Sequence, residues 1–137
     1  LEMRGADGGP WRRLCALPAL WAGLLYHQDS LDAAWSIASD WSMEERLKLR
    51  HDVPRLGLKA EIRGRTVQDI AGEVLDLAYR GLTARARLNG AGDNETGFLS
   101  PLRQVVESGE TPAERKLKLY NGTWKESVDP VFFECSY

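Results

Sequence analysis

The clearest pattern in this 137-residue sequence is a helical stripe near its centre. Between residues 67 and 82, apolar residues recur at spacings of three and four, which places them on one face of an α-helix. Thr66 followed by Asp69 predicts the start of this helix, and we expect it to run to about Arg87. Such a stripe is core, so the sequence predicts helices packed around it. The stripe consists of Val67, Ile70, Ala71, Val74, Leu77, Ala78 and Leu82.

Helices are also predicted on the N-terminal side of this stripe. The segment 14–26 is apolar nearly all round, which indicates a buried helix with Pro18 in its first turn. A second helix should start at Asp29 or Ser30 and end at about Ser39.

Next along the chain, Ser42 and Glu45 predict a capping box for a short charged helix that ends before Pro54. The segment 54–65 contains further glycines and is predicted to be a loop.

On the C-terminal side, one helix is predicted from Ser100 to Gly109, and another is capped by Thr111. The second should close at Asn121 and Gly122, which can supply a left-handed residue.

The opening stretch, LEMRGADGGPW, differs from the helical remainder. In an extended strand over residues 1–7, Glu2 and Arg4 would share one face, because successive side chains alternate. The glycines and the proline that follow favour a turn. From this spacing alone, an exposed strand with an ordinary salt bridge is the simpler interpretation.

A single strand cannot be stable, since both its edges carry unpaired backbone groups. The sequence also starts without a methionine, inside the apparent strand. We therefore expect a piece of a longer chain, whose missing N-terminal part supplies the sheet. The predicted fold class is mainly α: one N-terminal strand followed by five or six helices.

The net charge and the length of the apolar runs restrict which kinds of partner the chain can bind. A net charge of −2 provides no positive field for nucleic acid or anionic lipid, and no apolar run reaches the roughly 18 residues needed to span a bilayer. We expect no nucleic-acid or membrane partner.

The cysteines and histidines are isolated. Cys15 and Cys135 lie far apart and form no zinc motif, so two free thiols in a reducing compartment are expected. His27 and His51 are expected to be structural or surface residues.

Three segments together resemble the C-terminal part of glutamate–cysteine ligase of the plant and proteobacterial type. The loop from Arg85 to Thr96 and the terminal FFECSY depart from that pattern. The segments are LEMRGADGGPWRRLCALPALWAGLLY, DWSMEERLKLRHDVPRLGLK and TGFLSPLRQVVESGETPAERKLKLYNGTWKESVDPVFFE.

The resemblance implies that the chain belongs to an enzyme of the first step of glutathione biosynthesis. In that step ATP and Mg²⁺ are used to join the γ-carboxylate of L-glutamate to the amine of L-cysteine through an acyl phosphate. It also implies that residues 1–137 are the C-terminal portion of one α+β, glutamine-synthetase-like catalytic domain, with a strand at 1–7 and a helical part at 11–137. We expect a cytoplasmic location, or a plastid if the source is a plant.

Site residues follow from the same resemblance. It implies that Glu2 is a magnesium ligand and that Arg4 is the catalytic contact to a phosphoryl group or carboxylate. Asp7 would orient Arg4 or the metal shell, or cap the turn. Trp11 and Arg12 would line the cysteine pocket; the alternative is a packed tryptophan and a solvated arginine.

Two other functions remain open on the sequence: a helical interaction module without chemistry, and a ligase that accepts a different amine. Whether the protein forms a homodimer is also open. The fragment alone is expected to be inactive, because most of the nucleotide cleft would be missing.

Overall fold

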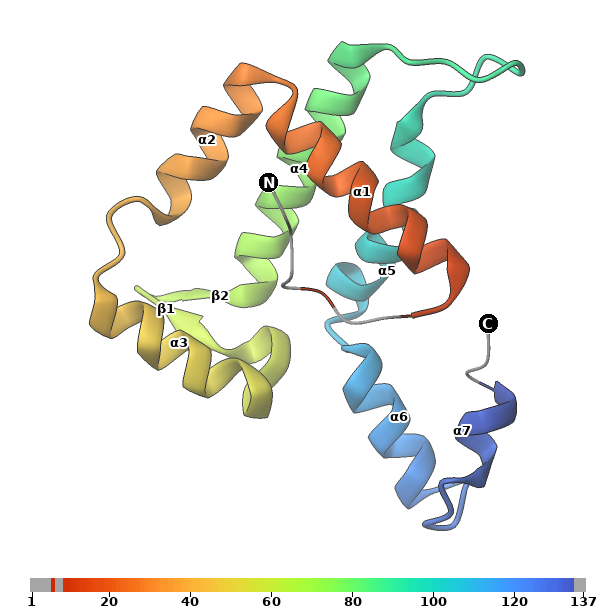
Figure 1. Cartoon of the computed structure of the whole chain (residues 1–137). Coiled ribbons are helices and arrows are strands. Elements are labelled where there is room, and N and C mark those ends of the chain that lie inside the picture. Colours follow the sequence, from red (N-terminus) through yellow and green to blue (C-terminus); the bar gives the residue numbers. More distant parts are fainter. Residues whose placement is uncertain (1–5, 7–8, 135–137) are drawn as a thin grey trace.

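The computed structural model describes residue 6 and residues 9–134, and in this part the chain is mainly α-helical (Figure 1). This confirms the predicted fold class, with seven α-helices instead of five or six. The predicted strand lies outside the described residues except for Ala6, which is exposed and not in a strand. The α-helices are α1 (Trp11–Leu25), α2 (Gln28–Ala38), α3 (Met43–Leu56), α4 (Val67–Arg85), α5 (Ser100–Ser108), α6 (Pro112–Asn121) and α7 (Asp129–Glu134). The remaining elements are the 3₁₀ turns η1 (Gly57–Lys59) and η2 (Glu95–Leu99) and the strands β1 (Glu61–Ile62) and β2 (Arg65–Thr66).

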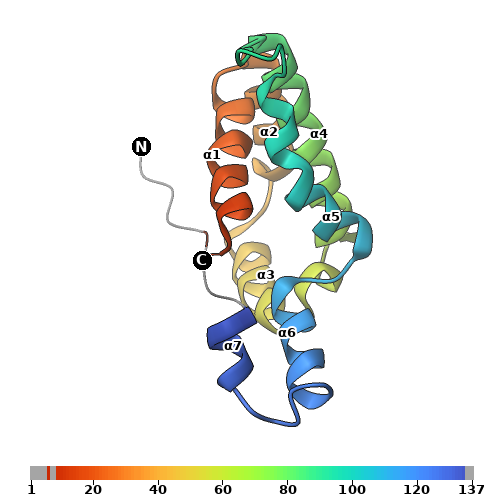
Figure 2. The same ribbon diagram turned by 90° about the vertical axis from the view of Figure 1, so that its right-hand side faces the viewer.

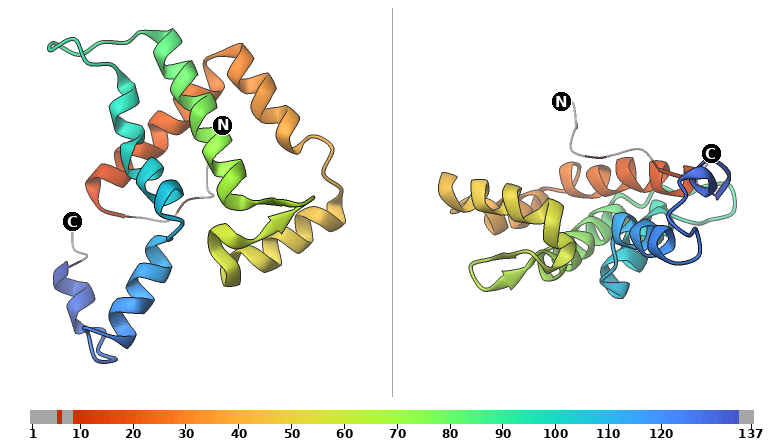
Figure 3. Two further views of the ribbon diagram at one scale, coloured as in Figure 1. Left: turned by 180° about the vertical axis from the view of Figure 1, so that it is seen from behind. Right: turned by 90° about the horizontal axis from the view of Figure 1, so that it is seen from below.

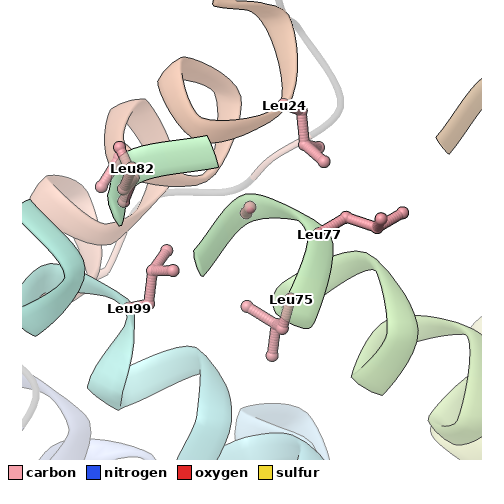
Figure 4. Packing of buried hydrophobic residues seen from close by; sticks show 7 residues of the cluster. Leu24, Leu75, Leu77, Leu82 and Leu99 are labelled. Atoms are coloured by element: carbon pink, nitrogen blue, oxygen red, sulfur yellow. The ribbon is translucent and has the colours of Figure 1, made fainter. Parts of the chain in front are cut away.

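Helix α4 carries the predicted stripe and forms the centre of the core. The hydroxyl of Thr66 accepts a hydrogen bond from the backbone N–H of Asp69, whose carboxylate accepts one from the N–H of Thr66, so the predicted cap is confirmed. The helix ends at Arg85, where Ala86 is left-handed. Leucines of α4 pack against Leu24 of α1 and Leu99 of η2 (Figure 4). The buried leucines of α4 are Leu75, Leu77 and Leu82.

Helices α1 and α4 cross in close backbone contact. A Cβ atom on Gly81 would overlap the carbonyl oxygen of Gly23, and a Cβ on Gly23 would overlap the carbonyl oxygen of Ala78. Helix α1 begins at Trp11, so Pro18 lies in its middle and not in its first turn as predicted. The start of the apolar segment was a misleading guide to the start of the helix, because the helix begins several residues before that segment.

Helix α2 is joined to α4 by a buried hydrogen bond. The hydroxyl of Ser30, which is 1% exposed, donates to the carbonyl oxygen of Leu77 at 2.8 Å. The predicted caps Asp29 and Ser30 lie inside α2; the N-cap is His27, whose ring nitrogen accepts from the N–H of Ser30. His27 therefore has the structural role expected.

Segment 54–65 is not the predicted loop. Helix α3 continues through Pro54, since a proline in the last turn disturbs only one backbone hydrogen bond, and it ends at Leu56, with Gly57 as its C-cap. Strands β1 and β2 then form an antiparallel hairpin beside α3 (Figure 3). At its two-residue turn, Arg63 and Gly64 both have positive φ angles, of 51° and 75°.

The last two helices, α6 and α7, extend away from α1, α4 and α5 (Figures 1 and 2). Thr111 caps α6 as predicted, but Gly122 has a φ of −113° and supplies no left-handed residue. The chain instead adopts positive φ angles at Lys125 and Glu126. Trp124 is buried, and its indole N–H donates to the carboxylate of Glu134 at 3.2 Å. No helix in the described part of the chain is long and apolar enough to cross a bilayer.

Candidate functional site

The predicted site residues divide into two groups. Glu2, Arg4 and Asp7 lie outside the described residues. Trp11 and Arg12 lie in the first turn of α1, which follows the opening stretch directly. The structure therefore describes the C-terminal edge of the predicted site.

Helix α1 has a positive N-terminal end. Pro10 occupies the N-cap position in an extended conformation, and its carbonyl oxygen accepts from the N–H groups of Arg13 and Leu14 at 2.7 and 3.2 Å. No side chain of the described residues caps the helix, and its first turn contains no acidic residue. The backbone N–H groups of this first turn and two adjacent arginines, Arg12 and Arg13, place positive charge immediately after the glycine-rich segment of the sequence.

The side chain of Trp11 is 75% exposed, so it does not pack into the core of the described residues. The alternative of a packed tryptophan is thus not found within this part of the chain. Arg12 is also exposed, but it borders a cavity.

This cavity, of about 240 Å³, lies where α1, α5 and α6 meet. Helix α5 contributes residues spaced three and four apart, which form a single face. Helix α6 contributes its first turn. The lining consists of Arg12 and Arg13 from α1, Pro101, Gln104, Val105 and Ser108 from α5, and Glu110, Thr111, Pro112 and Arg115 from the α5–α6 junction and α6.

Arg13, Gln104 and Arg115 were not predicted as site residues. Arg13 adjoins a predicted residue, which is a weak signal. Arg115 follows Arg12 by more than a hundred positions, so no local spacing links the two.

A second cavity, of about 530 Å³, contains none of the predicted site residues. Its charges are balanced: Lys118 Nζ lies 2.7 Å from Glu110 Oε1, and this hydrogen bond raises the pKa of Lys118. The backbone N–H of Thr111 donates to Glu114 and lowers the pKa of that carboxyl group. The contact of Glu114 belongs to the cap of α6, and the ion pair joins the residue before that cap to the last turn of the helix, so we assign this cavity a structural role. It is lined by Lys59, Gln68, Ser108, Gly109, Glu110, Glu114, Leu117, Lys118 and Asn121.

Metal ligands are scarce in the described part of the chain. No group of three or more His, Cys, Asp or Glu side chains there could hold a metal ion. Cys15 is a free, half-buried thiol within the described residues, and Cys135 lies outside them, so the expectation of two free thiols stays a prediction. His51 is exposed beside Asp52, in agreement with the predicted surface role.

Comparison with known proteins gives a consistent result. Residues 1–134 match the family described as Glutamate-cysteine ligase family 2 (GCS2). All 137 residues align at 53% identity with 25% of the chloroplastic glutamate–cysteine ligase of Arabidopsis thaliana, and at 54% identity with 27% of glutamate–cysteine ligase A, chloroplastic, of Oryza sativa subsp. indica. The corresponding Nicotiana tabacum protein is 53% identical over the same residues, again 25% of its length. The chain thus spans about a quarter of the length of these relatives.

These relatives are named chloroplastic, which contradicts the cytoplasmic location expected from the sequence. The error arose because nothing in these 137 residues specifies a compartment. Because the family match covers nearly every residue, this chain belongs to glutamate-cysteine ligase family 2.

Proposed function

We propose that this chain forms part of an enzyme that joins the γ-carboxylate of glutamate to the amine of cysteine, the first step of glutathione biosynthesis. The observation that carries the proposal is identity of 51–54% over the whole chain to proteins named glutamate–cysteine ligase. The names of these relatives also support a plastid location.

The reaction needs carboxylate activation, because a carboxylate anion repels nucleophiles and has no good leaving group. The proposed route uses ATP to convert the γ-carboxylate to an acyl phosphate, which the amine of cysteine then attacks with release of phosphate. When bound, Mg²⁺ would neutralise the crowded phosphate oxygens.

Residues of the opening stretch would hold these anions. In this proposal Glu2 is a ligand of Mg²⁺ and Arg4 contacts the phosphoryl group or the carboxylate, for which a planar guanidinium is suited. Asp7 orients Arg4 or the metal shell. Since the described residues contain no cluster of metal ligands, the other carboxylates would come from segments beyond this chain.

Trp11 and Arg12 are proposed to border the cysteine pocket. Support comes from the exposure of both side chains at the positive end of α1, directly after the opening stretch. Neither side chain is committed to packing within the described residues.

We propose that the working partner of this chain is the remaining part of a longer ligase, in a domain with a glutamine-synthetase-like sheet. Large apolar side chains are exposed, among them Trp35 (67%) and Phe132 (71%), and the relatives are about four times as long. A covering segment would remove these side chains from water. The isolated chain is accordingly expected to be inactive.

The test is a phosphate-release assay on the full-length protein with ATP, Mg²⁺, glutamate and cysteine. We expect release that depends on all four components and a γ-glutamylcysteine product detected by mass spectrometry. Release with another amino acid in place of cysteine, and none with cysteine, would indicate a ligase with a different acceptor. No release with any amine would leave a non-catalytic interaction module as the better description.

A further inference from the structure

Three arginines line the cavity between α1, α5 and α6: Arg12, Arg13 and Arg115. None of them forms an ion pair with a carboxylate of the described residues. The Nε atom of Arg13 is buried and has no hydrogen-bond partner there. A buried donor left unpaired is costly, so this arginine, which lines the cavity, needs an acceptor that the described residues do not supply.

The cavity contains little opposing negative charge. Among the described residues, Glu110 is the one acidic residue in its lining, and its carboxylate already pairs with Lys118 at 2.7 Å. Lys118 belongs to the other, larger cavity, so Glu110 is neutralised from that side. Within the described lining, the three arginines therefore leave an excess of positive charge.

We propose that this cavity binds the oxyanion group of a small phosphate- or carboxylate-bearing molecule. Guanidinium groups present paired N–H donors that match both kinds of oxyanion. Gln104 and Ser108 add polar groups from α5. A volume of about 240 Å³ suits a small anion better than a larger ligand, since pockets for drug-sized molecules start at about 300 Å³.

This inference goes beyond the ligase reaction and does not depend on it. The proposal rests on the charged and polar residues of α1, α5 and α6 that line the cavity, and it is tested by measuring anion binding, not catalytic activity. An anion bound here would also contact Arg12, and so would lie next to the proposed cysteine pocket.

The experiment measures binding of inorganic pyrophosphate, and separately of citrate, to the full-length protein by calorimetry at low ionic strength. Arg115→Gln removes one guanidinium, and Gln104→Glu keeps all three but adds a negative charge. Both sites are exposed, so we expect normal folding, checked by circular dichroism. Arg87→Gln is the matched control, because Arg87 is an exposed arginine outside the cavity lining.

We expect Arg115→Gln to weaken binding about tenfold and Gln104→Glu to weaken it at least as much. Arg87→Gln should leave it unchanged. A response to pyrophosphate alone would assign a phosphate ligand, and a response to citrate alone a carboxylate ligand. If neither probe binds, or if bound probe survives both cavity variants, the proposal is wrong, and the arginines pair instead with carboxylates elsewhere in the protein.

Discussion

The contact between Gly23 and Gly81 depends on two missing side chains. Each glycine lies in the interior of a helix, where alanine normally stabilises by about 1 kcal/mol. Here the space for a methyl group is filled by backbone atoms of the other helix. Packing therefore outweighs propensity at this crossing.

Gly81→Ala should lower the free energy of unfolding by about 1 to 3 kcal/mol, because α1 and α4 must move apart. Urea denaturation measures the change. Gly90→Ala is the control, since nothing lies within 4 Å of a Cβ at that position, and it should change stability by less than about 0.5 kcal/mol. Equal effects of the two substitutions would contradict the role of the crossing.

Arg63 connects the hairpin turn to the start of α3. Its Nε lies 2.7 Å from Glu45 Oε1, and its Nη2 donates to the carbonyl oxygen of Asp40 at 2.6 Å. The hydrogen bond from Arg63, with that from the backbone N–H of Ser42, lowers the pKa of Glu45 to about 2. The bonded form of Glu45 is thus the ionised one.

This depressed pKa predicts how stability depends on pH. A carboxyl group with a lowered pKa in the folded protein contributes stability above its unfolded value, near 4.5, and loses it as the pH falls toward about 2. Arg63→Gln should reduce the loss of thermal stability between pH 5 and about 2. The melting temperature across this range is the measurement, and a slope identical to that of the unaltered protein would argue against the contact.

At the scale of elements, the sequence predicted helix starts correctly where the capping contact joins residues within four positions of each other. The caps of α3, α4 and α6 were all predicted, and each shows both hydrogen bonds of the capping box. The hairpin was missed because its turn is Arg63–Gly64, and an arginine with positive φ is not the usual turn signal. The end of α3 was predicted too early, because a proline interrupts a helix less when it lies in the last turn, as Pro54 does.

The bond between α2 and α4 gives a prediction at this scale. Ser30→Ala removes the buried hydrogen bond to the carbonyl oxygen of Leu77 and should cost about 1 to 2 kcal/mol of stability. Ser36→Ala removes a bond of the same kind on α2, from an exposed hydroxyl to the carbonyl oxygen of Asp32, and should have almost no effect. Chemical denaturation of both variants separates burial from loss of a hydroxyl.

At the scale of the whole molecule, the family was predicted from segment resemblance but the arrangement of the site was not. Arg12 and Arg115 line one cavity although they are far apart in the sequence, and the packing of α1 against α5, which leads into α6, brings them to it. The three residues with the strongest predicted roles, Glu2, Arg4 and Asp7, lie outside the described residues, so their roles stay predictions.

Arg4→Lys in the full-length protein should lower kcat/KM at least about tenfold, because an ammonium cannot reproduce bidentate contact. Arg87→Lys provides a control for loss of a guanidinium on the surface. Steady-state kinetics with ATP, glutamate and cysteine measures both. Equal rates for Arg4→Lys and the unaltered enzyme would exclude Arg4 from the reaction.

The glycine crossing also has a mechanical consequence. Gly23 lies about 18 Å along α1 from Trp11, at 1.5 Å per residue. If α1 tilted by about three degrees about Gly23, its N-terminal end at Trp11 would move by about 1 Å. Such a shift is large enough to misalign reacting groups. A methyl group added at Gly81 should therefore slow turnover of the full-length protein at temperatures where it is still fully folded.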